Sequence, residues 1–201
     1  MEQQHRRRLR TLVELPLLVI LALSLTLVVK HNVAQAFSIP SESMEPQLQV
    51  GDRVLVSRVA YRLHDPRRGD IVVFRSPSAA PDDEGLLQRA LHDVLETVAL
   101  RNPGKGELIK RVVGLPGETI EGRDGQVVVD GRLVVEPYLD ELTVTGDFGP
   151  VLVPDGHVFV LGDNRTNSRD SRFPEVGPIP VDSIVGRAIG RIWPPSRRAF
   201  L

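Results

Sequence analysis

The chain has 201 residues, of which 41% are hydrophobic and 25% charged, as is ordinary for one or two folded domains. Its net charge of -1 gives no sign of a nucleic-acid partner, and the absence of cysteine excludes disulfides, thiol catalysis and cysteine-ligated zinc. Residues 1–30 are basic while the rest of the chain is acidic overall, so we expect the two parts to meet different environments.

The N-terminal part combines a basic tail, residues 1–11, with an uncharged apolar run from Leu15 to Val29. As a helix the run would rise about 22 Å, somewhat less than the bilayer core of about 30 Å, and its flanks extend it. We therefore predict a transmembrane anchor over residues 12–30. The arginines before it predict a cytoplasmic N-terminus and a body on the other side. A cleavable secretory signal ending at Ala34-Gln35-Ala36 fits the same pattern, and it also exports the body.

The remaining residues, 37–201, predict one mainly β domain. Strand patterns cover residues 53–59, 71–74, 108–113, 119–123, 126–129, 132–136, 157–161 and 183–193. Asp124-Gly125 and Asp130-Gly131 are strong hairpin signals. Residues 82–100 instead place apolar side chains at helical spacing, and we interpret them as a packing helix within an inserted segment at about 80–104. The expected fold is an antiparallel β-sheet domain with one inserted helix, preceded by a single transmembrane helix.

Two serines follow the apolar run within Phe37 to Leu48, FSIPSESMEPQL. Its two prolines discourage regular structure. An extended chain would direct Ser41 and Ser43 to the same side. Taken alone, the segment is more typical of a polar linker, because turns favour serine.

Lys110 lies in a strongly apolar predicted strand, where alternation places it on the face of Leu108 and Val112. A serine hydroxyl becomes a good nucleophile only when a base takes its proton. A lysine can be that base only when it is neutral, and burial lowers its pKa. Arg111 would point to the opposite face and stay charged. The alternative is a solvent-facing lysine on an edge strand.

A polar loop, GDNRTNSRDSR from Gly162 to Arg172, follows another apolar strand. It can form a rigid hydrogen-bond network beside a site or a solvated turn. No spacing of histidine and acidic residues resembles a metal site. The sequence leaves a Ser-His-Asp triad open, because triads form in space, but none of the candidate bases lies in a recognisable triad setting. These are His5, His31, His64, His92 and His157.

Together and in this order, IPSESMEP, IKRVVGLPGE and GDNRTNSRDSR resemble the type I signal peptidases of bacteria, particularly the single-anchor kind of cyanobacteria. The resemblance covers Phe37 to about Pro195. It implies a serine endopeptidase that removes N-terminal signal peptides from exported preproteins after small residues, through an acyl-enzyme and without metal or cofactor. It also implies a retained anchor in the plasma membrane, with the catalytic domain on the outer (periplasmic or lumenal) face. The implied partners are preproteins and the lipid bilayer, with no nucleic acid.

The resemblance further implies roles for individual residues. Ser43 matches the nucleophile, Lys110 its general base, and Ser41 a hydroxyl that helps the Ser43 N–H to hold the oxyanion. Ser168 matches a serine that orients the lysine. The supporting residues of the loop are Asp170 and Arg172, which match a structural ion pair, and Asp163, Asn164 and Arg165.

The sequence departs from the family at two places. Thr166 stands where many members have an acidic residue, and the stretch from Pro77 to Gly106 is less familiar, so no family function is carried onto it. Two other functions share features with the chain. A Ser-Lys autoprotease of the LexA type would need a DNA-binding module where the apolar run lies, and an inactive, membrane-tethered peptide-binding protein would use the same β surface without cleavage.

Overall fold

The computed structural model describes residues 14, 16–21, 34–77 and 106–201. Residues 14 and 16–21 are helical. Within the described ranges no helix has both the length and the apolar character needed to cross a bilayer. The transmembrane anchor therefore stays a prediction, and the inserted helix expected at residues 82–100 lies outside the described residues.

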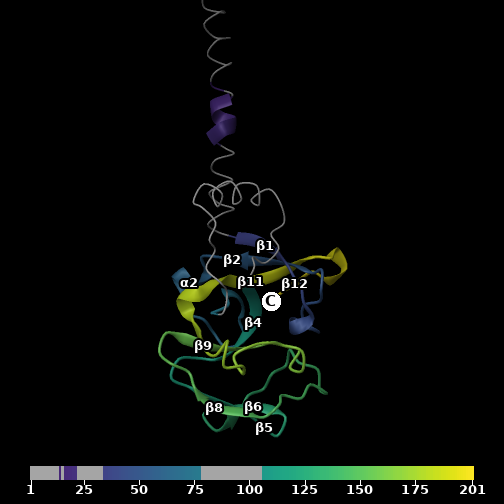
Figure 1. Ribbon diagram of the computed structural model, residues 1–201. Coiled ribbons are helices and arrows are strands. Elements are labelled where there is room, and N and C mark those ends of the chain that lie inside the picture. Colours follow the sequence, from purple (N-terminus) through teal and green to yellow (C-terminus); the bar gives the residue numbers. More distant parts are fainter. Residues whose placement is uncertain (1–13, 15, 22–33, 78–105) are drawn as a thin grey trace, which may run out of the picture.

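An eight-stranded sheet forms the larger part of the fold (Figure 1). All its paired strands are antiparallel, which confirms the expected mainly β, antiparallel class. Their order is β1 (Ala34–Ser38), β2 (Arg53–Ser57), β11 (Ile184–Trp193), β3 (Ile71–Arg75), β4 (Glu107–Gly114), β9 (His157–Leu161) and β10 (Ile179–Pro180), with β12 (Ala199–Phe200) beside β11. Strand β4 thus lies inside the sheet, between β3 and β9.

A second, four-stranded sheet lies at the end of the molecule away from β1 (Figure 1). Its order is β7 (Arg132–Leu133), β6 (Gln126–Val129), β5 (Thr119–Arg123) and β8 (Phe148–Leu152). Both predicted hairpins are present, since Asp124, Gly125, Asp130 and Gly131 all have positive φ, between 49° and 81°. Two successive residues of positive φ are the mark of the tight turn that matches strand twist.

Within residues 34–77 and 106–201, the short helical elements lie in connections between strands. They are α2 (Ala60–Leu63) and the 3-10 turns η1 (Glu42–Met44), η2 (Val181–Ser183) and η3 (Pro195–Arg197).

Three of the differences from the strand prediction have an identifiable reason, and the short strands β10 and β12 were also missed. The strand expected at residues 132–136 ends at Leu133, because Glu136 turns away to pair with Arg165. Strand β1 was missed because its alanines resemble a cleavage site more than a strand. Strand β8 was missed because Gly149-Pro150 interrupts its pattern. Proline is tolerated in β8 because this strand pairs on one side only, with β5.

The core explains why a charged residue of β4 is enclosed. Ile109 packs in the cluster around β1, β2 and η1, Val112 in the cluster around β3 and β9, and Val113 in the cluster of the second sheet. Each fully buried side chain of this kind contributes about 1.5–3 kcal/mol through its removal from water. Strand β4 is therefore fixed from both faces, and its polar side chains are held inside the protein with it.

Candidate active site

Ser43 lies in the turn η1 between β1 and β2, and it is 8% exposed. Met44, the next residue, is fully buried in the core cluster and anchors the turn. The expectation of an extended chain through the two serines was wrong at this point, because residues 42–44 form a 3-10 turn. The turn still keeps the Ser41 and Ser43 hydroxyl oxygens 3.3 Å apart, with Ser41 on the exposed side.

Lys110 lies in β4 opposite Val72 and is only 2% exposed. Its Nζ donates a hydrogen bond to Ser43 Oγ at 2.8 Å and one to the Ile109 carbonyl at 2.7 Å. The alternative of a solvent-facing lysine on an edge strand is wrong, because β4 is flanked by β3 and β9. The fold thus joins two side chains that are 67 residues apart in the chain.

Burial lowers the pKa of Lys110 from its ordinary 10.5 to about 8, although the negative charges of Asp170 and Asp163 oppose the shift. The physical cause is the cost of holding an ammonium ion away from water. With a pKa of about 8, roughly one-tenth of the lysine is neutral at pH 7, about 300 times more than with the ordinary value. The geometry and the electrostatics therefore suit a base that takes a proton from Ser43.

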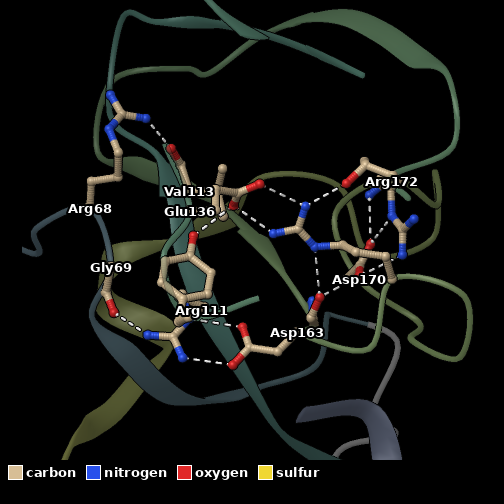
Figure 2. Close-up of polar contacts among 12 residues, drawn as sticks. Arg68, Gly69, Arg111, Val113, Glu136, Asp163, Asp170 and Arg172 are labelled. Atoms are coloured by element: carbon tan, nitrogen blue, oxygen red, sulfur yellow. Dashed lines mark hydrogen bonds and ion pairs between the residues drawn. The ribbon is translucent and has the colours of Figure 1, made fainter. Parts of the chain in front are cut away.

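The polar loop from residue 162 to 172 packs directly against this pair. A side chain at Gly162 would overlap both the Ser168 hydroxyl and the carbonyl oxygen of Ser43, so these groups lie close together. Ser168 is buried, but its Oγ has no hydrogen-bond partner in the described part of the chain, so it makes no hydrogen bond to Lys110. Asp170 accepts from the Gly162 N–H at 3.0 Å and pairs with Arg172 at 2.8 Å, as Figure 2 shows.

A buried ion pair connects the lysine strand to the same loop (Figure 2). Arg111 binds Asp163 through two hydrogen bonds of 2.8 and 2.6 Å and also donates to the Gly69 carbonyl. Burial raises the pKa of the Asp163 carboxyl, and its bonds to Arg111 act against this. Because Arg111 follows Lys110 directly, this pair fixes the strand on which the lysine is carried.

Sequence reasoning missed two residues that extend this network. Tyr138 lies under the Arg111 guanidinium, 3.8 Å from ring centre to Cζ, and its hydroxyl donates to Glu136. Glu136 in turn binds Arg165 at 2.6 and 3.0 Å, and Arg165 holds the Gly162 carbonyl. No clear signal for them lies in the sequence, because Glu136 was assigned to the strand expected at residues 132–136 and Tyr138 to no element.

The other features of the described residues do not compete with this site. His64 and His157 contact backbone carbonyls of Asp65 and Asp155, and neither contacts Ser43. A cleft of about 870 Å³ lies elsewhere, and none of the site residues lines it. Its wall includes Arg58, Tyr61, Arg62, Arg75 and Asp182.

Comparison with known proteins shows the family to which the chain is similar. The family described as signal peptidase, peptidase S26, matches residues 12–193. Signal peptidase I of Mycobacterium tuberculosis is 38% identical over 218 residues, which cover 93% of this chain and 74% of the relative. Probable signal peptidase I-2 of Synechocystis sp. is 38% identical over 191 residues, which cover 95% and 78%.

A solved structure of signal peptidase I from Enterococcus faecalis is 30% identical and covers 62% of this chain and 97% of its own, with a TM-score of 0.42.

The match over most of the chain defines its class: this is a peptidase of the signal peptidase I type. The chain belongs to the signal peptidase family, peptidase S26.

Proposed function

We propose that the protein is a membrane-bound serine endopeptidase that removes N-terminal signal peptides from exported preproteins, with Ser43 as nucleophile and Lys110 as general base. The observation that carries this proposal is the 2.8 Å contact between Lys110 Nζ and Ser43 Oγ inside the protein. Family membership supports the peptidase activity. The positions of the two residues support the chemistry assigned to them.

In the first half of the reaction, neutral Lys110 takes the Ser43 hydroxyl proton while Ser43 Oγ attacks the carbonyl carbon of the scissile bond. The carbonyl oxygen becomes an oxyanion, which accepts hydrogen bonds from the Ser43 N–H and the Ser41 hydroxyl. One such bond contributes about 3 kcal/mol to transition-state stabilisation. Lys110 then gives its proton to the leaving amine as the peptide bond breaks, and an acyl-enzyme remains.

In the second half, Lys110 takes a proton from water, and the resulting nucleophile attacks the acyl carbon. The same oxyanion forms again and collapses, and the Ser43 hydroxyl is restored. The substrate binds as an extended strand along an edge of the sheet, with small side chains at the cleaved sequence. Neither half of the reaction calls on a metal or cofactor.

The predicted anchor over residues 12–30 holds the enzyme in the plasma membrane, with the N-terminus in the cytoplasm and the catalytic domain outside. This topology brings the serine turn close to the bilayer, where the signal peptide of an exported protein emerges. Protease added to sealed inside-out vesicles checks the topology, because it should spare the catalytic domain and remove only the basic tail. Digestion of the domain from that side contradicts the predicted orientation.

The catalytic assignment is tested with purified full-length protein in detergent and a preprotein substrate. Ser43→Ala and Lys110→Met should each abolish cleavage while the protein remains folded. Ser183→Ala is a matched control, because this hydroxyl only binds the Pro180 carbonyl in the turn η2. Full activity of either dyad variant would refute the assignment.

An acylating inhibitor separates the enzyme from an inactive peptide-binding protein. A penem should add its mass to Ser43 in the wild-type protein and not in Ser43→Ala. Absence of labelling in the wild-type protein, together with unprocessed but bound preprotein, would favour the binding function. A rate that follows a histidine-like pKa and disappears in His157→Ala would favour a triad.

A further inference from the structure

The peptide unit between Glu42 and Ser43 determines where the proposed oxyanion donor points. Its N–H is that donor, and its carbonyl points the opposite way. This bond is not among the cis peptides of the described chain. In a planar trans peptide the two dipoles are antiparallel, so fixing the carbonyl oxygen also fixes the direction of the N–H. Within the described residues the Ser43 N–H makes no hydrogen bond, which leaves it available to a ligand.

The Glu42 carbonyl is held from two directions. The Glu45 N–H donates to it within the turn at 3.0 Å, and Asn164 Nδ2 donates to it from the polar loop at 3.2 Å. A carbonyl oxygen has two lone pairs, so these bonds satisfy it fully. The Asn164 backbone N–H also donates to the Ser43 carbonyl at 3.1 Å. One residue therefore fixes the carbonyl on each side of the nucleophile.

The side-chain amide of Asn164 is itself locked in orientation. Its Oδ1 accepts from the Asn167 N–H at 3.2 Å and from the Thr166 hydroxyl at 3.2 Å. Since a backbone N–H can only donate, Oδ1 must face Asn167, and the Nδ2 group must face Glu42. Thr166 thus supports the amide by donating a hydrogen bond.

We propose that Asn164 is a positioning residue for the oxyanion hole, which acts by holding the Glu42 carbonyl and thereby aiming the Ser43 N–H at the oxyanion. Within the described residues, Asn164 makes no hydrogen bond to Lys110. The hydrogen bond from Asn164 to the Glu42 carbonyl also polarises the Glu42–Ser43 peptide, because hydrogen bonds in a chain strengthen one another. This inference rests on the proposed function, since it presupposes that an oxyanion forms beside Ser43.

Asn167 provides a matched control on the same loop. Its Nδ2 donates to the Glu42 carboxylate at 3.1 Å, so it joins the loop to the same residue without touching the peptide carbonyl. If the loop from residue 162 to 172 only holds the turn η1 in place, removing either asparagine side chain should lower the rate by a similar factor. If the carbonyl contact matters, Asn164→Ala should lower the rate and Asn167→Ala should leave it near the wild-type value.

The experiment measures steady-state cleavage of a fluorogenic peptide by full-length enzyme in detergent, with melting temperature as the folding check. Removing a direct oxyanion donor costs about 100- to 1,000-fold in kcat, so we expect a loss of about tenfold for Asn164→Ala, which acts through the donor. KM and the acidic limb of the pH profile should not change, since substrate contacts and Lys110 are untouched. The inhibition constant of a peptide aldehyde, whose adduct carries an oxygen in the hole, should rise by the same factor.

Each other outcome overturns the inference. Unchanged kcat in Asn164→Ala, an equal loss in Asn167→Ala, or a shifted acidic limb would each contradict positioning of the oxyanion hole. If Asn164→Ala does not fold, Thr166→Val carries the test, with an expected loss of about threefold in kcat, and no loss contradicts the proposal. Inactive Ser43→Ala beside fully active Asn164→Ala refutes this inference alone, whereas active Ser43→Ala refutes the proposed function and this inference with it.

Discussion

Replacing the buried lysine by an apolar residue of similar length should stabilise the protein near neutral pH. At pH 9.5 an unfolded Lys110, with its ordinary pKa of 10.5, is protonated, whereas the folded lysine, with a pKa of about 8, is neutral. The unfolded state therefore binds more protons between these two values, and wild-type stability rises with pH across this window. At about 1.4 kcal/mol per pH unit, the buried lysine costs about 3 kcal/mol of stability at pH 7.

Lys110→Met removes this cost but also removes two hydrogen bonds, each contributing about 1 kcal/mol. The difference in unfolding free energy between the variant and the wild type is therefore more informative in its pH dependence than in its size. We expect the stability of the variant relative to the wild type to fall by about 2 kcal/mol from pH 7 to pH 9.5. Urea unfolding of both proteins in detergent, followed by the fluorescence of the single tryptophan, measures this difference in stability at each pH. A difference that stays constant over this range would refute the lowered pKa and with it the neutral base.

Three further results are expected. The kcat/KM of the wild type should rise about tenfold per pH unit below pH 8 and level off above it, since neutral Lys110 is the base; a plateau already reached at pH 6.5 would contradict this. Gly162→Ala should abolish peptide cleavage because the added methyl overlaps the nucleophile turn, whereas Gly146→Ala, which has open space, should not; equal rates would contradict the packing. Asp163→Ala should destabilise the protein to urea by about 3–5 kcal/mol, because it leaves Arg111 charged and buried without its carboxylate; a loss below about 1 kcal/mol would show the pair to be solvated.

Much of the fold could be predicted from periodicity. Strands β5, β6 and β9 begin and end as expected, because their alternation or apolar character is bounded by clear Asp-Gly turns. Strand β8 could not be predicted, because only its place at the edge of the second sheet makes its proline acceptable. The anchor and the helix of the inserted segment remain predictions from the apolar pattern alone.

The candidate site could be predicted only as separate pieces. The residue types of Ser43 and Lys110 and the apolar strand around the lysine suggested a base and a nucleophile, and the family resemblance joined them. The contribution of Glu136 and Tyr138 could not be foreseen, because a carboxylate after a hairpin is usually solvated. These side chains gained their partners through the packing of the second sheet against the loop from residue 162 to 172.

The sequence by itself determined the mainly β class and the residue types of each motif, and it predicted export, because these depend on composition and on spacing along the chain. Only the tertiary structure decided that Lys110 lies on an interior strand, because burial of both faces depends on which strands flank it. The structure also brought Asn164 onto the carbonyl of Glu42. Contacts between residues so far apart in the chain follow from the packing of the whole sheet, which no local pattern encodes.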